Sequence, residues 1–147
     1  MAGKIASGYV GRSAQAWDKP GGAGPVTEAD LAVDSYLKTV LMGARPDYGW
    51  LSEETEDTAA RLSRDTVFIV DPIDGTKAFI TGKPTFTTLI ALLHRGVPVL
   101  GIIDPDNTKS LPPAVAASTG LDVLSHALES YTAIPFDQRP RPGRPIL

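Results

Sequence analysis

The side chains that could do chemistry in this sequence gather between Asp71 and Thr76. Two carboxylates, Asp71 and Asp74, stand three positions apart with a proline between them and a glycine after them, which predicts a stiff turn. The apolar run 67–70 before this turn has the pattern of a short buried strand. Ligand sites of layered α/β proteins lie at the carboxyl ends of strands. Because crowded acidic oxygens repel one another, the stretch predicts a site for a hard cation such as Mg²⁺.

A third carboxylate, that of Glu53, follows a second short strand predicted over 48–51. If the two strands are neighbours in one sheet, Glu53 joins Asp71 and Asp74 at the same sheet end. Such a set can hold two or more Mg²⁺ ions. Paired ions suit the hydrolysis of phosphate esters, because one ion activates water while the other stabilises the leaving oxygen.

Gly75 and Thr76 extend this hypothesis to a substrate. Their N–H groups could bind phosphate oxygens if a helix or turn begins there, and the Thr76 hydroxyl could orient the attacking water. A simpler interpretation is that Asp71 and Asp74 only form a turn, as Asp-Pro and Asp-Gly sequences often do. Their combination after a buried strand, with an acidic pair upstream, favours the metal site.

Two residues further upstream also have simple explanations. Asp30 stands three positions after Thr27, so a capping box at the start of a helix accounts for it. Lys19 opens the glycine- and proline-rich loop 19–25, where a surface charge is common. This loop has neither the spacing of a dinucleotide-binding motif nor that of a P-loop.

The elements that must position these residues are short. The sequence predicts a helix over 27–42, which Thr27 caps and Gly43 ends. A turn from His94 to Gly96, with the glycine left-handed, joins two apolar strands into a hairpin. The other predicted elements are a weak helix over 1–17, a polar loop or short helix over 56–65, an irregular connection over 77–84, and strands over 86–93 and 97–103.

Composition excludes several classes of protein. The net charge of −3 gives no electrostatic footprint for nucleic acid or an anionic membrane. The chain has no cysteine, so it can form neither disulfides nor thiolate metal sites. It has no apolar run near the ~20 residues of a membrane span and no signal-peptide core, so we expect a cytoplasmic protein.

These motifs together are similar to those of a known family. Residues 17–104 resemble the inositol monophosphatase superfamily of Mg²⁺-dependent, lithium-sensitive phosphatases, and in particular its bacterial branch with histidinol-phosphate phosphatases. The resemblance implies an α+β, layered fold with a short mixed or antiparallel sheet and flanking helices, and a small phosphorylated substrate. The matching motifs are Trp17 to Lys19, Pro25 to Asp30, Trp50 to Thr55, Val70 to Phe79 and Gly82 to Asp104.

The resemblance also implies a role for each site residue. The metal ligands are expected to be Glu53, Asp71, Asp74 and the backbone carbonyl of Ile73. Glu53 and Thr76 serve the metal-activated water, and Asp30, which can still cap its helix, supports that water without itself binding metal. Lys19 is counted with the catalytic residues, and Gly75 and Thr76 with the phosphate-binding ones.

The sequence departs from this family after Asp104. Chains of the family are longer and carry, towards their C-terminal end, a Trp-Asp motif whose Asp binds a further ion. No Trp-Asp pair follows Asp104 here, and the half of the family that recognises substrate has no counterpart. We therefore expect a partial fold over residues 1–104, the metal-binding half of a phosphatase, and this puts turnover by the chain in doubt.

The remaining residues resemble a different family. From Asp104 onwards the sequence is similar to iron-containing alcohol dehydrogenases, in particular the hydroxyacid–oxoacid transhydrogenase branch. Asp122 and His126 match metal ligands there, and residues four apart share one helix face, where they could bind Fe²⁺ or Zn²⁺. That site needs two more histidines, whereas the only other one is His94. The simpler interpretation is a helix cap and a surface histidine.

A chimera is the simplest account, with the join near Ile103–Asp106. An engineered fusion, a gene rearrangement and an assembly error would all produce it. The predicted domains are a phosphatase-like domain over residues 1–104, a helical segment over 105–133 and a Pro- and Arg-rich extended tail over 134–147. A half-sheet without its partners exposes apolar surface, so we expect marginal stability or homo-oligomers.

Three functions follow from these resemblances. The first is Mg²⁺-dependent hydrolysis of a phosphomonoester such as inositol phosphate or histidinol phosphate. The second is an NAD- and iron-dependent alcohol dehydrogenase fragment. The third is a metal-binding fragment without catalysis.

Overall fold

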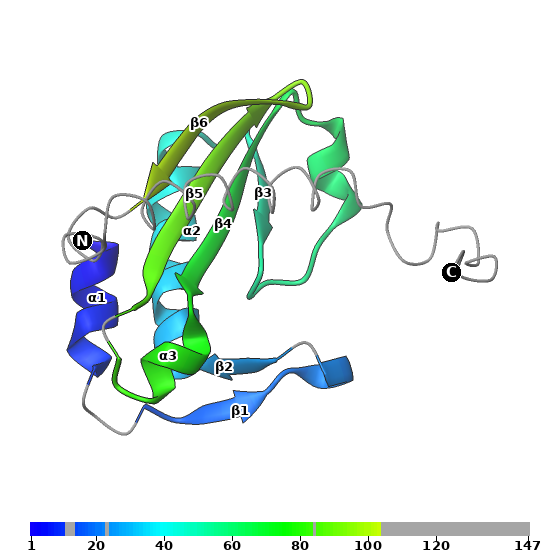
Figure 1. The fold of residues 1–147 in the computed structure, drawn as a ribbon. Helices are drawn as coiled ribbons and strands as arrows, with labels where there is room; N and C mark the ends of the chain where they lie inside the picture. Colours follow the sequence, from blue (N-terminus) through cyan, green and yellow to red (C-terminus); the bar gives the residue numbers. More distant parts are fainter. Residues whose placement is uncertain (11–13, 23, 84, 104–147) are drawn as a thin grey trace, which may run out of the picture.

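The computed structural model describes residues 1–10, 14–22, 24–83 and 85–103, which form an α+β arrangement (Figure 1). A mixed four-stranded sheet in the order β3-β4-β5-β6 lies at its centre, with β3 parallel to β4 and the other pairs antiparallel. The fold class expected from the sequence is thereby confirmed. The segments 105–133 and 134–147, with Asp122 and His126, lie outside the described residues.

The elements are short and closely spaced along the chain. The helices are α1 (Ala2–Tyr9), α2 (Glu28–Ala44) and α3 (Thr76–Ile80), and the 3₁₀ turns are η1 (Pro20–Gly22) and η2 (Ala59–Ser63). The strands are β1 (Ala16–Asp18), β2 (Pro25–Thr27), β3 (Gly49–Ser52), β4 (Thr66–Asp74), β5 (Thr87–His94) and β6 (Val97–Ile103). β1 and β2 form a separate antiparallel ribbon below the main sheet in Figure 1.

The main core lies between the sheet and the helices α1 and α2. α2 runs behind β4 and β5 in Figure 1, and α1 lies beside it. The buried side chains of this core come from both helices, from β4 and α3, and from the residue before β5: Ala6, Ala29, Val33, Leu37, Phe68, Val70, Ile73, Phe79 and Phe86. Alternate residues of β5 point to the other face, where Leu89, Ala91 and Leu93 pack with Ile69.

The start of α2 is as predicted, and its end is not. The Thr27 side chain accepts hydrogen bonds from the backbone N–H groups of Ala29 and Asp30, while the Asp30 carboxylate accepts one from the Thr27 N–H, so the capping box is present. Gly43 was expected to end the helix, but α2 continues to Ala44. A glycine only weakens a helix, by roughly 1 kcal/mol relative to alanine. The N–H of Arg45 donates to the Leu41 carbonyl, which satisfies the last turn.

The predicted turn at Asp71 is instead an irregular continuation of β4. Asp71 pairs with Leu89 and Asp74 with Thr87, and the register shifts between these two pairs. The shift contains Pro72, which has no N–H to give to the ladder, so the strand bulges where proline interrupts the pairing. The connection predicted to be irregular over 77–84 begins with α3.

Two smaller predictions were also tested. The weak helix over 1–17 is wrong beyond Tyr9, because Val10 is extended and residues 16–18 form β1. The hairpin between β5 and β6 is confirmed, with Arg95 and Gly96 at φ 50° and 78°. Such left-handed pairs match the twist of the flanking strands.

Within the described ranges, no helix is both long and apolar enough to cross a membrane.

Candidate metal centre

The parallel pair β3 and β4 brings the predicted carboxylates to one end of the sheet. Ser52 at the end of β3 pairs with Val70, so the next residues, Glu53 and Asp71, lie side by side. The N–H of Glu53 also donates to the Val70 carbonyl, at 3.2 Å, which extends the contact by one residue. The prediction of a shared carboxylate site required the two strands to be neighbours in one sheet, and this is confirmed.

Two threonine hydroxyls hold the backbone of the bulge. Thr88 Oγ1 on β5 donates to the Pro72 carbonyl at 2.9 Å. Thr76 Oγ1 lies 3.0 Å from the Ile73 carbonyl oxygen and donates to it. Because Pro72 and Ile73 are buried, these bonds fix the path of the chain between Asp71 and Asp74. Thr88 was missed from the sequence, since only the register of β5 shows which carbonyl it reaches.

Asp71 carries the observation that points most directly to a cation. Its Oδ1 is buried and has no hydrogen-bond partner among the described residues. Burial, followed by the charges of Glu53 and Asp74, raises the pKa of Asp71 to about 8. A buried carboxyl oxygen without a donor, beside two further carboxylates, is an arrangement that a divalent cation stabilises. The donors are all oxygen, which suits Mg²⁺.

The three carboxylates are neighbours without forming a closed cage. Among the described residues, no three acidic or histidine side chains lie close enough to share one ion. The charges of Glu53 and Asp74 still act on Asp71, because Coulomb interactions extend beyond coordination distance. The half-exposed Glu53 side chain interacts with both neighbours: its Oε1 lies 2.8 Å from Lys19 Nζ, and its hydrogen bond with Asp71 contributes to the raised pKa of Asp71.

Lys19 is a partly buried bridge between two acids and not a simple surface charge on a loop. Its Nζ contacts Glu53 Oε1 and Glu54 Oε1, both at 2.8 Å, and its side chain is 13% exposed. Burial lowers the pKa of Lys19, but hydrogen bonds to Glu53 and Glu54 and their charges outweigh burial and raise it. Burial raises the pKa of Glu54, against the Lys19 contact. The single positive charge of the lysine therefore offsets part of the negative charge of the acidic pair.

Asp30 is both a helix cap and a support for Thr76. It is fully buried, and its Oδ2 accepts from the Thr27 N–H at 2.8 Å and from the Thr27 hydroxyl. Its other oxygen, Oδ1, lies 3.3 Å from Thr76 Oγ1. The single Thr76 proton is thus shared between Asp30 and the Ile73 carbonyl. Burial raises the pKa of Asp30, and its bonds to Thr27 oppose that shift.

Gly75 is required where β4 turns into α3. Its φ of 95° is left-handed, and a Cβ there would lie 2.8 Å from the Thr85 carbonyl oxygen. α3 begins at Thr76, so the helix or turn that the phosphate hypothesis needed is present. The role of Gly75 and Thr76 toward phosphate remains a prediction.

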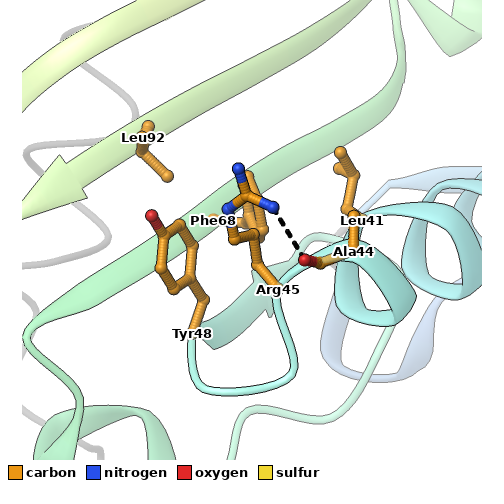
Figure 2. Close-up of a pocket in the computed structure, with 6 residues that line it drawn as sticks. All are labelled: Leu41, Ala44, Arg45, Tyr48, Phe68 and Leu92. Carbon is orange, nitrogen blue, oxygen red and sulfur yellow. Dashed lines mark hydrogen bonds between the residues drawn. The ribbon is translucent and has the colours of Figure 1, made fainter.

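A hollow of about 330 Å³ lies elsewhere on the molecule, against the C-terminal end of α2. Figure 2 shows Tyr48 and Leu92 on one side, Leu41 and Ala44 on the other, and Arg45 in front of Phe68 between them, with the Arg45 guanidinium bonded to the Ala44 carbonyl. Its lining contains none of the predicted site residues. It is therefore not part of the carboxylate site.

The comparisons with known proteins agree with this geometry. A sequence model of the inositol monophosphatase family matches residues 1–112. The histidinol-phosphatase of Mycobacterium tuberculosis is 47% identical over 79 residues, which are 54% of this chain and 30% of that protein. The crystal structure of the extragenic suppressor protein suhB from Bartonella henselae is similar with a TM-score of 0.64 and 36% identity, over 69% of this chain and 40% of that one.

A separate stretch is similar to other proteins. The probable mitochondrial hydroxyacid-oxoacid transhydrogenase of Dictyostelium discoideum is 63% identical over 49 residues, which are 33% of this chain and 9% of that protein. Both resemblances seen in the sequence are thus confirmed, while the domain boundaries stay predictions. The chain spans less than half the length of the curated relatives it matches. Because the family match covers most of its residues, this chain belongs to the inositol monophosphatase family.

Proposed function

We propose that residues 1–104 form the Mg²⁺ site of a phosphomonoester hydrolase acting on a small substrate of the inositol phosphate or histidinol phosphate type. The observation that carries this proposal is the buried, unpartnered Oδ1 of Asp71 beside Glu53 and Asp74. Relatives whose names describe histidinol and inositol phosphatases support the choice of substrate class. Family membership supports a divalent cation, and the oxygen donors favour Mg²⁺.

The residues that would hold two or more ions are Glu53, Asp71, Asp74 and the carbonyl of Ile73. Bound Mg²⁺ would supply positive charge to the phosphate oxygens and make a water molecule more acidic. Binding would favour the ionised form of Asp71. Glu53 contacts Lys19 through Oε1, so its second carboxylate oxygen would serve an ion without that contact being broken.

Thr76 and Glu53 would act on the attacking water. The Thr76 proton is directed to Asp30 and to the Ile73 carbonyl, so the hydroxyl oxygen is left to accept a hydrogen bond from one O–H of the water. Glu53 would be the base that removes the other proton of that water. Gly75, without a side chain, would let the N–H groups at the start of α3 approach the phosphate.

Two measurements on the same pair of variants test this function. We would measure Mg²⁺ binding by calorimetry and phosphate release from histidinol phosphate, inositol phosphate and a nucleotide bisphosphate, using residues 1–147. Asp74→Asn should lose both, whereas Asp47→Asn, a carboxylate exposed after α2, should keep both. Equal Mg²⁺ binding by the Asp74→Asn protein and the unaltered chain would refute the site. Binding without phosphate release would select the non-catalytic metal-binding fragment.

The match to transhydrogenases supports a second, independent test. If Asp122 and His126 bind Fe²⁺ or Zn²⁺, that binding should disappear in His126→Ala while Mg²⁺ binding at Asp71 persists. Equal Zn²⁺ binding by both proteins would remove the oxidoreductase hypothesis.

A further inference from the structure

Helix α2 carries two buried carboxylates one turn apart. Asp30 is 0% and Asp34 is 4% exposed. Burying a carboxylate is costly unless hydrogen bonds compensate for the lost water. Asp30 has its explanation in the capping box and Thr76, whereas Asp34 stands in the second turn of the helix, where no cap is needed. A reason for Asp34 has to come from what it contacts.

The contact that Asp34 makes is with the end of β3. The Ser52 hydroxyl donates to Asp34 Oδ1, and the same hydroxyl oxygen accepts a hydrogen bond from the Glu54 N–H at 3.2 Å. Burial raises the pKa of Asp34, and the Ser52 hydrogen bond, followed by the charge of Lys38 one turn further along α2, opposes that shift. Lys38 makes no salt bridge among the described residues, so Ser52 is the hydrogen-bonding partner of the buried Asp34.

Two hydrogen bonds, one from each set of contacts, hold the backbone on the two sides of the Glu53 side chain. The Glu53 N–H is held by the Val70 carbonyl of β4, and the next N–H, that of Glu54, is held by Ser52. The Glu54 side chain is only 4% exposed and turned to Lys19. The N–H of Glu53 and the following one are therefore both fixed, and they hold the Glu53 backbone beside Asp71, with which the Glu53 side chain interacts.

We propose that Asp34 is a positioning residue that, through Ser52, fixes the Glu53–Glu54 backbone so that Glu53 faces the metal centre. This inference rests on the proposed function. Asp34 itself touches neither ion nor substrate. α2 then supports both halves of the centre from one face: Asp30 holds Thr76 at the end of β4, and Asp34 holds Ser52 at the end of β3.

The first measurement uses the metal-free chain of residues 1–147. Hydrogen exchange of the Glu54 amide, followed by NMR, should be about fivefold faster in Ser52→Ala, which removes its acceptor. Asp34→Ala should accelerate it less, because the serine stays but can rotate. Asp34→Asn should behave like the unaltered chain, because an amide oxygen still accepts from Ser52. Amides in the middle of α2 report any general loss of stability.

The second measurement is Mg²⁺ affinity by calorimetry. Loss of a residue that orients a metal ligand costs about 10–100-fold in affinity. We expect about tenfold weaker binding in Ser52→Ala and Asp34→Ala, and near-normal binding in Asp34→Asn. If Asp34→Ala fails to fold, Ser52→Ala and Asp34→Asn carry the test.

The outcomes distinguish a failure of this inference from a failure of the proposed Mg²⁺-dependent function. Unchanged Glu54 exchange in Ser52→Ala overturns the inference, and so does unchanged Mg²⁺ affinity in a chain that otherwise binds Mg²⁺. Asp74→Asn should lose Mg²⁺ and keep slow Glu54 exchange. If the unaltered chain does not bind Mg²⁺, the proposed function fails, and the exchange rates alone decide whether Asp34 holds the end of β3.

Discussion

β4 and β6 are both neighbours of β5, yet their surroundings are opposite. β4 is paired on both sides, and its Val67 and Val70 are 1% and 2% exposed. β6 has one neighbour among the described strands, and four of its apolar side chains, Val97, Val99, Leu100 and Ile102, are 46% to 60% exposed. β4 is thus packed into a core, whereas β6 is an edge strand of the sheet that the described residues form.

The difference shows that the site around β4 has its supporting contacts within the described residues, whereas the apolar edge at β6 does not. Around β4 the carbonyls of Pro72 and Ile73 have donors, and Lys19 bridges the acidic pair after β3. These partners all lie between positions 19 and 88 of the sequence. An apolar strand edge instead needs a second surface to cover it. The candidate site is therefore expected to form even if β6 stays uncovered.

The largest effect is expected at β4, from Asp71→Asn. The change keeps the size of the side chain but removes the charge that a cation would need. We expect Mg²⁺ affinity measured by calorimetry to fall by more than the 10–100-fold typical of losing a ligand's supporting partner. Val99→Lys on β6 should leave the affinity unchanged. An Asp71→Asn protein that binds Mg²⁺ normally would show that the buried Oδ1 is not a ligand.

Much of the fold followed from local sequence signals. The capping box at Thr27, the hairpin glycine Gly96 and the apolar strands were all readable because each depends on residues close in sequence. The errors arose where tertiary pairing decided the outcome. β5 continues to pair beyond Asp71, so a stretch with proline and glycine became a bulge followed by α3.

The candidate site was predictable in its carboxylates and not in their supports. Asp71, Asp74 and Glu53 stand out by type and spacing, and one parallel strand pair suffices to bring them together. Thr88 and Ser52 are ordinary strand residues whose roles depend on register. Asp34 did leave a signal, because an acid four residues after Asp30 falls on the same helix face as the core.

A second prediction concerns the pH dependence of stability without metal. The pKa of Asp71 is raised to about 8 in the folded chain, above its usual value, so the folded state holds an extra proton between about pH 4 and pH 8. Stability should therefore fall as pH rises through that range and level off above about 8. Urea denaturation in EDTA at pH 5, 7 and 9 measures this.

Two comparisons sharpen the pH prediction. Asp71→Asn should remove the contribution of Asp71 to the decline over the whole of that range, and Mg²⁺ should oppose the decline because it binds the ionised form. Burial also raises the pKa of Asp30, Asp34 and Glu54, so a smaller decline of the same sign should persist in Asp71→Asn. Identical curves for the variant and the unaltered chain would contradict the assignment to Asp71.

The smallest effect is expected at the open edge. If β6 associates with a second copy through its exposed apolar side chains, Val99→Lys should weaken that association, because a charge on an edge strand opposes pairing. Leu62→Lys on η2 is the matched control, since Leu62 is 52% and Val99 55% exposed. Sedimentation velocity over a range of concentrations should show less self-association for Val99→Lys alone. Equal sedimentation of both variants and the unaltered chain would mean that β6 is not the contact. The side chains of β6 would then be exposed without mediating self-association.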